Sequence, residues 1–142
     1  MNTYDYNCGV IDAFNEVVRA GVKDLALSHP SSKDIIEKLL PFTQMITAKY
    51  GTQYEVEENL LITDLFPFSA NKGKTVILFW KKNEVIEKYH CLKEKKQKAI
   101  HEGNYEEVRY EIAYEFGRLL SYSQESIEKF IAENPEKEVY TY

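Results

Sequence analysis

The stretch Thr75-Val76-Ile77-Leu78-Phe79-Trp80 decides the fold class of this 142-residue chain. Most of its residues are β-branched or aromatic, and such residues favour an extended strand. Residues 67–73, directly before it, have the composition of a loop, and residues 60–66 form a second apolar run. We therefore expect a small antiparallel β-hairpin near residues 60–80, with residues 60–66 and 75–80 as its two strands.

The segment before this hairpin supports two interpretations. Residues 53–57 alternate between polar and apolar side chains, as a half-buried strand does. Thr52 and Glu55, however, have the spacing of a capping box, which would begin a helix. The sequence therefore leaves residues 52–66 open between strand and helix.

Apolar residues recur at helical spacing on both sides of the expected hairpin. Ser32, Asn104 and Ser123 are the expected N-terminal caps of three helices, and Gly51 is an expected C-terminal stop. Pro41 should kink or break the helix that contains it, because proline has no backbone N–H to donate. The helices are expected at residues 5–27, 32–51, 83–101, 104–119 and 123–134.

The predicted architecture is a mostly helical α+β fold, with about five helices around one core and the small antiparallel hairpin. An all-α bundle is the alternative. We expect residues 1–135 to form a single compact domain and residues 136–142 a short, flexible C-terminal tail. Gly117 lies inside an expected helix, where glycine costs about 1 kcal/mol relative to alanine. Its presence there indicates a neighbour packed closely against the helix backbone.

The composition excludes several classes of protein. Hydrophobic residues make up 44% of the chain and 11 residues are tyrosine, which is not the composition of a disordered protein. No apolar run approaches the roughly 20 residues that a membrane helix needs. The N-terminus does not have the pattern of a signal peptide, and the 2 cysteines are too few for a disulfide scaffold. We expect a soluble, reduced, cytoplasmic protein.

Charge is distributed unevenly along the chain. Residues 81–102 carry 7 basic and 4 acidic groups, whereas residues 103–142 carry 4 basic and 9 acidic groups. An acidic surface attracts basic partners and speeds their association. Lysine far outnumbers arginine, and such usage is typical of AT-rich coding sequences, which indicates a low-GC bacterium or one of its phages.

A stripe of tyrosine and arginine is the candidate binding surface. Tyrosine and arginine are the residue types most enriched in the hot spots of protein interfaces. Tyr110, Tyr114 and Arg118 are spaced four apart, so a helix places them on one face. The stripe predicts binding to another protein or to a second copy of this chain, as a homodimer. The candidate protein-binding residues are Arg109, Tyr110, Tyr114, Arg118 and Tyr122.

A metal site between helices is an alternative interpretation. Glu87 and His90 form a Glu-x-x-His element, and Glu111 and Glu115 lie one turn apart on the following helix. Di-metal bundles use two Glu-x-x-His elements with two further glutamates, and here the second such element is missing. The favoured prediction therefore includes no metal and no cofactor, and a small-molecule or metal-binding helical protein stays the alternative.

Residues 104–133 suggest a further alternative, a DNA-binding regulator. Ala113 and Gly117 are spaced as in the first helix of many helix-turn-helix units. The following helix, however, carries three glutamates and one lysine, and this charge is the wrong sign for facing phosphates. The sequence therefore argues against nucleic acid as a partner. The sequence favours a non-enzymatic protein-binding or regulatory module, and an enzyme is the less favoured interpretation.

Overall fold

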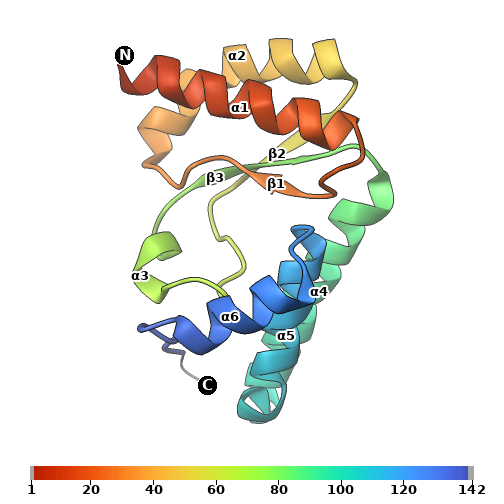
Figure 1. The fold of residues 1–142 in the computed structure, drawn as a ribbon. Helices are drawn as coiled ribbons and strands as arrows, with labels where there is room; N and C mark the ends of the chain where they lie inside the picture. The colour runs from red at the N-terminus through yellow and green to blue at the C-terminus, as the bar shows by residue number, and fades with distance from the viewer. Residues whose placement is uncertain (1, 141–142) are drawn as a thin grey trace. The chain divides into compact units, whose positions relative to one another are not determined.

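The computed structural model describes residues 2–140, which form a mostly helical α+β fold with a small antiparallel sheet (Figure 1). The predicted fold class is confirmed. Over the described residues, the helices are α1 (Thr3–Arg19), α2 (Lys33–Tyr50), α3 (Phe68–Asn71), α4 (Asn83–His101), α5 (Tyr105–Leu119) and α6 (Gln124–Glu133). The strands are β1 (Ala26–Leu27), β2 (Gln53–Glu57) and β3 (Val76–Trp80).

The chain divides into two compact units. The first unit contains the chain up to Leu60 together with Gly73–Val85. The second contains Leu61–Lys72 and the chain from Ile86 onward. The expectation of one compact domain over residues 1–135 stays a prediction, and each unit is described below by itself.

The sheet of the first unit has the strand order β1-β3-β2, and β3 pairs antiparallel with both neighbours. The β2–β3 register places Gln53 opposite Trp80 and Glu57 opposite Val76. Because both outer strands oppose β3, β1 and β2 run parallel to each other and α2 connects them. This arrangement is a split β-α-β unit.

The predicted hairpin is right in one strand and wrong in the other. Residues 76–80 form β3, but its long partner is β2, so the predicted strand at residues 60–66 and the all-α alternative are both wrong. Residues 60–66 are irregular although Leu61 and Leu65 are buried. Their backbone N–H groups donate to side-chain hydroxyls instead of a neighbouring strand, Leu61 to Tyr89 at 3.0 Å and Leu65 to Thr63 at 3.1 Å.

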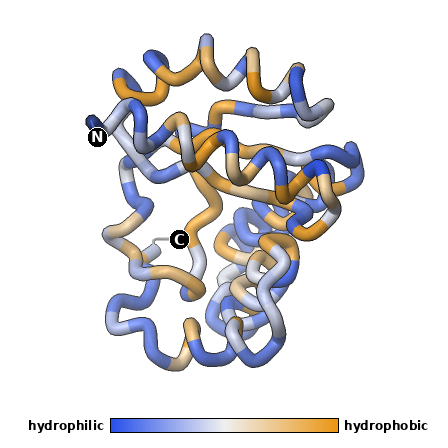
Figure 2. Tube along the Cα trace, turned by 45° about the horizontal axis from the view of Figure 1, so that its top comes forward, coloured by the Kyte–Doolittle hydropathy of each residue, from blue (hydrophilic) through white to orange (hydrophobic). Residues whose placement is uncertain are grey.

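The core of the first unit lies between the sheet and the layer formed by α1 and α2 (Figure 1). Ile77 and Phe79 point from β3 into this core, as alternation along a strand requires. The colouring of Figure 2 shows hydrophobic and hydrophilic positions alternating along both helices. The helical residues of the core are Cys8, Ile11, Val18, Ile36, Leu39 and Ile46.

The boundaries of these helices correct two expectations. The first helix ends at Arg19 rather than near residue 27, because Gly21 adopts a φ of +78° and turns the chain into β1. The second helix continues through Pro41, which neither ends nor breaks it. It stops at Gly51, in the left-handed conformation with φ of +68°, as predicted.

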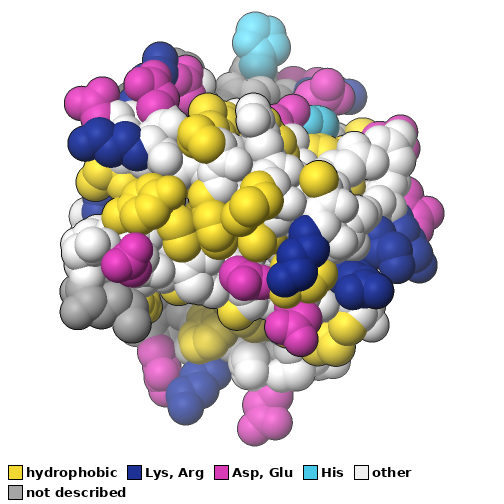
Figure 3. Space-filling model, turned by 90° about the horizontal axis from the view of Figure 1, so that it is seen from above, with side chains coloured by type: hydrophobic (Ala, Val, Ile, Leu, Met, Phe, Trp, Pro, Cys, Tyr) yellow, Lys and Arg dark blue, Asp and Glu magenta, His cyan; other side chains and the backbone are white. Residues whose placement is uncertain are grey.

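Hydrophobic side chains also gather on the outer side of the α1–α2 layer (Figure 3). Tyr6 on α1 and Met45 on α2 expose 58% and 57% of their surface. Tyr6 is therefore an exposed tyrosine of the first unit, as Tyr110 is of the second.

In the second unit, α4 and α5 are joined by a short turn at Gly103, where φ is +76°. Lys95 of α4 bridges to Glu111 and Glu115 of α5 at 3.1 and 3.2 Å. Ser123 caps α6 as predicted, since its hydroxyl accepts from the Ser126 N–H at 3.1 Å.

The close neighbour predicted for Gly117 is confirmed. A Cβ atom at this position would lie 2.6 Å from Cγ1 of Ile127 on α6. Only glycine therefore lets α6 approach α5 this closely.

Alanine at position 117 should therefore destabilise the protein. We expect Gly117→Ala to lower the free energy of unfolding by about 1–3 kcal/mol, because it overpacks the contact with Ile127. Gly9→Ala is the control, since a Cβ there meets nothing within 4 Å, and it should raise stability by about 0.5–1 kcal/mol. Urea unfolding measures both, and a stabilising Gly117→Ala would contradict the packing argument.

Candidate functional site

The outer face of α5 carries three of the five predicted binding residues. Tyr110 is 51% exposed, Arg118 is exposed and Tyr114 is half-buried. Their four-residue spacing on a regular helix places them in one row. We call Tyr110, Tyr114 and Arg118 the α5 row.

Arg109, the fourth predicted residue, is held in the interior contacts of the second unit. Its guanidinium donates to the Asp64 carboxylate at 2.8 and 3.0 Å, and to the Glu106 carboxylate at 2.7 Å. Only 18% of its side chain is exposed. These contacts occupy its fork of donors, so Arg109 lies apart from the exposed row, and its role in protein binding stays a prediction. Asp64 lies 45 residues away in the chain, so helical spacing gave no sign of this pairing.

Tyr122, the fifth residue, belongs to an aromatic cluster. Its ring meets Phe66 edge-on with centroids 6.4 Å apart and Phe130 at 5.4 Å. Burial raises the pKa of its hydroxyl. Arg118 donates to the carbonyl oxygen of Tyr122 at 3.1 Å. Tyr122 therefore supports the end of the α5 row from a half-buried position.

A group that the sequence reasoning missed surrounds the carboxylate of Glu138. This carboxylate accepts from the Lys96 ammonium and the Tyr105 hydroxyl, and 3% of its side chain is exposed. Asp64 and Arg109 bind the backbone of the same residue. We call Asp64, Lys96, Tyr105, Arg109 and Glu138 the buried polar cluster. No sequence motif predicted this cluster, because its members come from four separate segments of the chain.

The segment expected to be a flexible tail takes part in this cluster. Glu136 accepts from the backbone N–H of Ser69 at 2.6 Å and Glu138 is buried. The sequence suggested a free tail because the segment is polar, but the Glu138 carboxylate accepts from buried Lys96 and Tyr105. Residues 141–142 of the expected tail lie outside the described residues.

The cluster shifts the protonation of its members. Burial alone would raise the pKa of Asp64, but hydrogen bonds from Arg109 and from the Glu138 N–H lower it below its usual value. Burial, followed by the hydrogen bond to Glu138, raises the pKa of the Tyr105 hydroxyl strongly. The hydrogen bonds to Asp64 raise the pKa of Arg109. At neutral pH the cluster therefore holds a carboxylate, a phenol and a guanidinium in fixed ionisation states.

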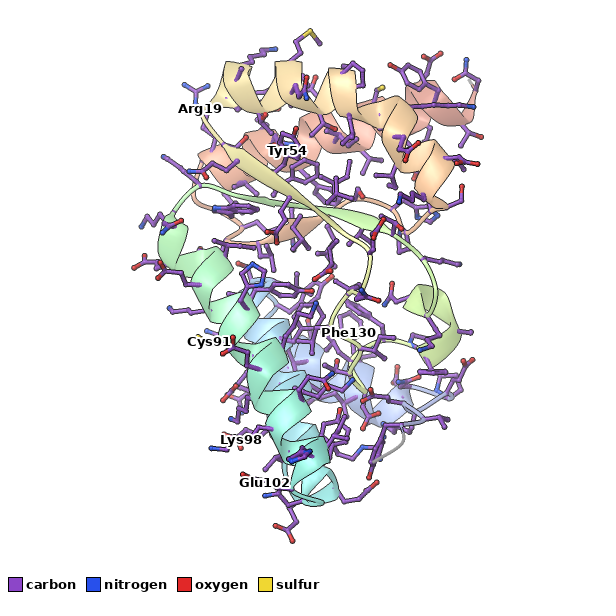
Figure 4. The ribbon with its side chains drawn as sticks, turned by 180° about the vertical axis from the view of Figure 1, so that it is seen from behind. Arg19, Tyr54, Cys91, Lys98, Glu102 and Phe130 are labelled. Atoms are coloured by element: carbon purple, nitrogen blue, oxygen red, sulfur yellow. The ribbon has the colours of Figure 1, made fainter. Side chains whose placement is uncertain are left out.

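The alternative metal residues are not gathered into a site. Among residues 2–140, no three His, Cys, Asp or Glu side chains lie close enough to hold an ion. Glu111 and Glu115 pair with Lys95 instead. His90 packs its ring against Tyr89 with centroids 5.5 Å apart. Figure 4 shows the neighbouring Cys91, and Lys98 further along α4, projecting outward from the helix.

The surface of α6 keeps the charge expected from the sequence. Glu125, Glu128 and Glu133 are exposed, together with Lys129. This sign favours a basic partner over a phosphate backbone. Among the helices that the structure describes, none has both the length and the apolar character of a membrane span.

No family model, curated protein or solved structure matches this chain in the comparisons with known proteins.

The ion pair between Asp64 and Arg109 makes the stability of the protein depend on pH. We expect Asp64→Asn to lower the free energy of unfolding at pH 7 by about 3 kcal/mol, because partly buried Arg109 loses the more buried of its two carboxylate partners. The ordinary pKa of Asp64 is 3.8 and the folded value is lower. The ion-pair contribution is thus complete above pH 4 and is lost as the pH falls through the folded pKa.

The difference in the free energy of unfolding between wild type and Asp64→Asn should consequently become smaller as the pH falls below about 4. Urea unfolding at a series of pH values measures this difference. Glu125→Gln, which removes an exposed carboxylate on α6, is the control and should stay close to wild type throughout. A difference that does not change with pH would contradict the assigned role of Asp64.

Proposed function

We propose that this chain is a small, intracellular, non-enzymatic protein-binding module whose contact surface is the α5 row. The observation that carries the proposal is the exposure of Tyr110, which presents half of its surface beside Tyr114 and Arg118. Large aromatic side chains next to arginine are the usual anchors of protein interfaces.

The charge around the α5 row supports a partner with a basic surface. Glu107 and Glu111 are exposed on the same helix, and α6 adds further exposed glutamates. The segment 103–142 carries 9 acidic and 4 basic groups. At the α5 row, such a field speeds the approach of a basic partner, while the tyrosine rings supply the apolar contact.

A photo-crosslinker placed at position 110 tests this proposal directly. We expect p-benzoylphenylalanine at Tyr110 to give a discrete higher-mass adduct in lysate of a low-GC bacterium. The same group at Tyr6, the matched exposed tyrosine of the first unit, should give no such adduct. A second copy of the chain as partner would give an adduct of twice the protomer mass.

Two further results make this experiment decisive. Arg118→Ala in the crosslinking chain should reduce the adduct at least fivefold while circular dichroism stays unchanged, since Arg118 is exposed. Raised salt should reduce it as well, because the attraction is between exposed charges. Equal adducts from positions 110 and 6, or none at position 110, would contradict the proposal.

A further inference from the structure

The described part of the chain after α6 has no regular secondary structure and lies against other segments of the second unit. Glu136, Glu138 and Tyr140 touch the unit, whereas Val139 between them is 71% exposed. Lys137 also touches the unit, because its ammonium donates to the carbonyl oxygen of Ile131 on α6. We call residues 136–140 the strap.

The unit binds the backbone of the strap at Glu136 and at Glu138. The N–H of Phe68 donates to the carbonyl oxygen of Glu136 at 3.0 Å. The carboxylate of Asp64 accepts from the N–H of Glu138 at 2.9 Å, and Arg109 donates to the carbonyl oxygen of Glu138 at 2.9 Å. Asp64 and Arg109 are also paired with each other, at 2.8 and 3.0 Å. A donor and an acceptor are therefore fixed in place for the main chain of any extended segment.

The side chains of the strap are selected by charge and by ring contact. Lys96 and Tyr105 both donate to the Glu138 carboxylate. The ring of Tyr140 packs edge-on against Tyr105 with centroids 4.7 Å apart, and the Arg109 guanidinium lies 5.4 Å from the Tyr140 ring. At the other end, Ser69 donates to Glu136 from its N–H at 2.6 Å and its hydroxyl at 3.0 Å.

The groups that hold the strap belong to elements with packing of their own. Lys96 lies on α4 between buried Leu92 and Ala99, and Arg109 lies on α5 ahead of buried Ile112. The strap itself adds little apolar burial and no regular secondary structure. Its attachment is mostly polar, which sets it apart from the helices it contacts.

An empty strap site would keep an unbalanced charge. Lys96 would lose the Glu138 carboxylate and would keep its bond to the Ile62 carbonyl oxygen, at 2.6 Å, and its contact with the Tyr105 ring, at 5.5 Å. The Lys96 ammonium and the Tyr105 hydroxyl would then both lack the carboxylate that they share, so the vacated site favours a new carboxylate. The chemistry of the site thus selects an acidic ligand.

From these contacts we propose that Asp64, Lys96, Tyr105 and Arg109 form a peptide-binding site that the strap occupies as an exchangeable internal ligand. The ligand class is an extended acidic peptide of the pattern Glu-x-Glu-x-Tyr, presented by a partner protein. This site is separate from the α5 row and selects the opposite charge. The strap regulates it, because a tethered ligand competes at an effective concentration of about millimolar.

The test uses a fluorescent synthetic peptide with the sequence of residues 134–142 and the full-length chain. Fluorescence anisotropy should show that Glu138→Ala binds this peptide at least tenfold more tightly than wild type, because the internal ligand has lost its carboxylate. A control peptide carrying Glu138→Gln should bind the same variant at least tenfold more weakly. Equal binding of both peptides, or equal binding by both chains, would overturn the proposal.

Hydrogen exchange of the wild-type chain provides a measurement that does not depend on a variant. The backbone amides of the strap should exchange at least tenfold faster than those in the middle of α4 and α5, because the strap opens by itself. If the amides of the strap, α4 and α5 exchanged at the same rate, the strap would open only with the whole unit, and the proposal would fail. This comparison decides the question if Glu138→Ala does not fold.

Discussion

The ion pair between Asp64 and Arg109 is the contact on which the second unit depends. It joins an irregular segment without secondary structure to the middle of a helix, and its two charges then fix the backbone of Glu138. Buried charges are tolerated only where pairing and further hydrogen bonds satisfy them. Here each partner has more than one bond, so the loop and α5 are held together and offer a fixed site to the strap.

Local signals in the sequence predicted most of the helical framework. The long helix at residues 83–101 has the predicted bounds, Gly51 stops α2, and Ser123 caps α6. Each of these helix boundaries depends on residues within about one helical turn, and such local effects can be predicted from the sequence. Gly117 was informative for a different reason, because an unfavourable residue inside a helix requires a compensating contact.

The sheet pairing and the buried polar cluster could not be predicted in the same way. An apolar run such as residues 60–66 has the same sequence pattern whether its backbone hydrogen-bonds to a neighbouring strand or to side-chain hydroxyl groups. Arg109 and Tyr110 are adjacent and both residue types are common in interfaces. Arg109, however, pairs with the carboxylate of Asp64, which lies on a loop distant in the sequence. Spacing showed which face of α5 Tyr110 and Tyr114 share, but not which neighbours would already be engaged.

The interleaved course of the chain has a consequence for its synthesis on the ribosome. The two outer strands emerge first, but β3, which lies between them, follows only after the chain has passed through residues 61–72 of the other unit. The first unit therefore cannot close its sheet until residue 80 has left the exit tunnel. Until then, both outer strands present unpaired edges, which are prone to wrong pairing. For the same reason, no single cut of the polypeptide separates one intact unit from the other.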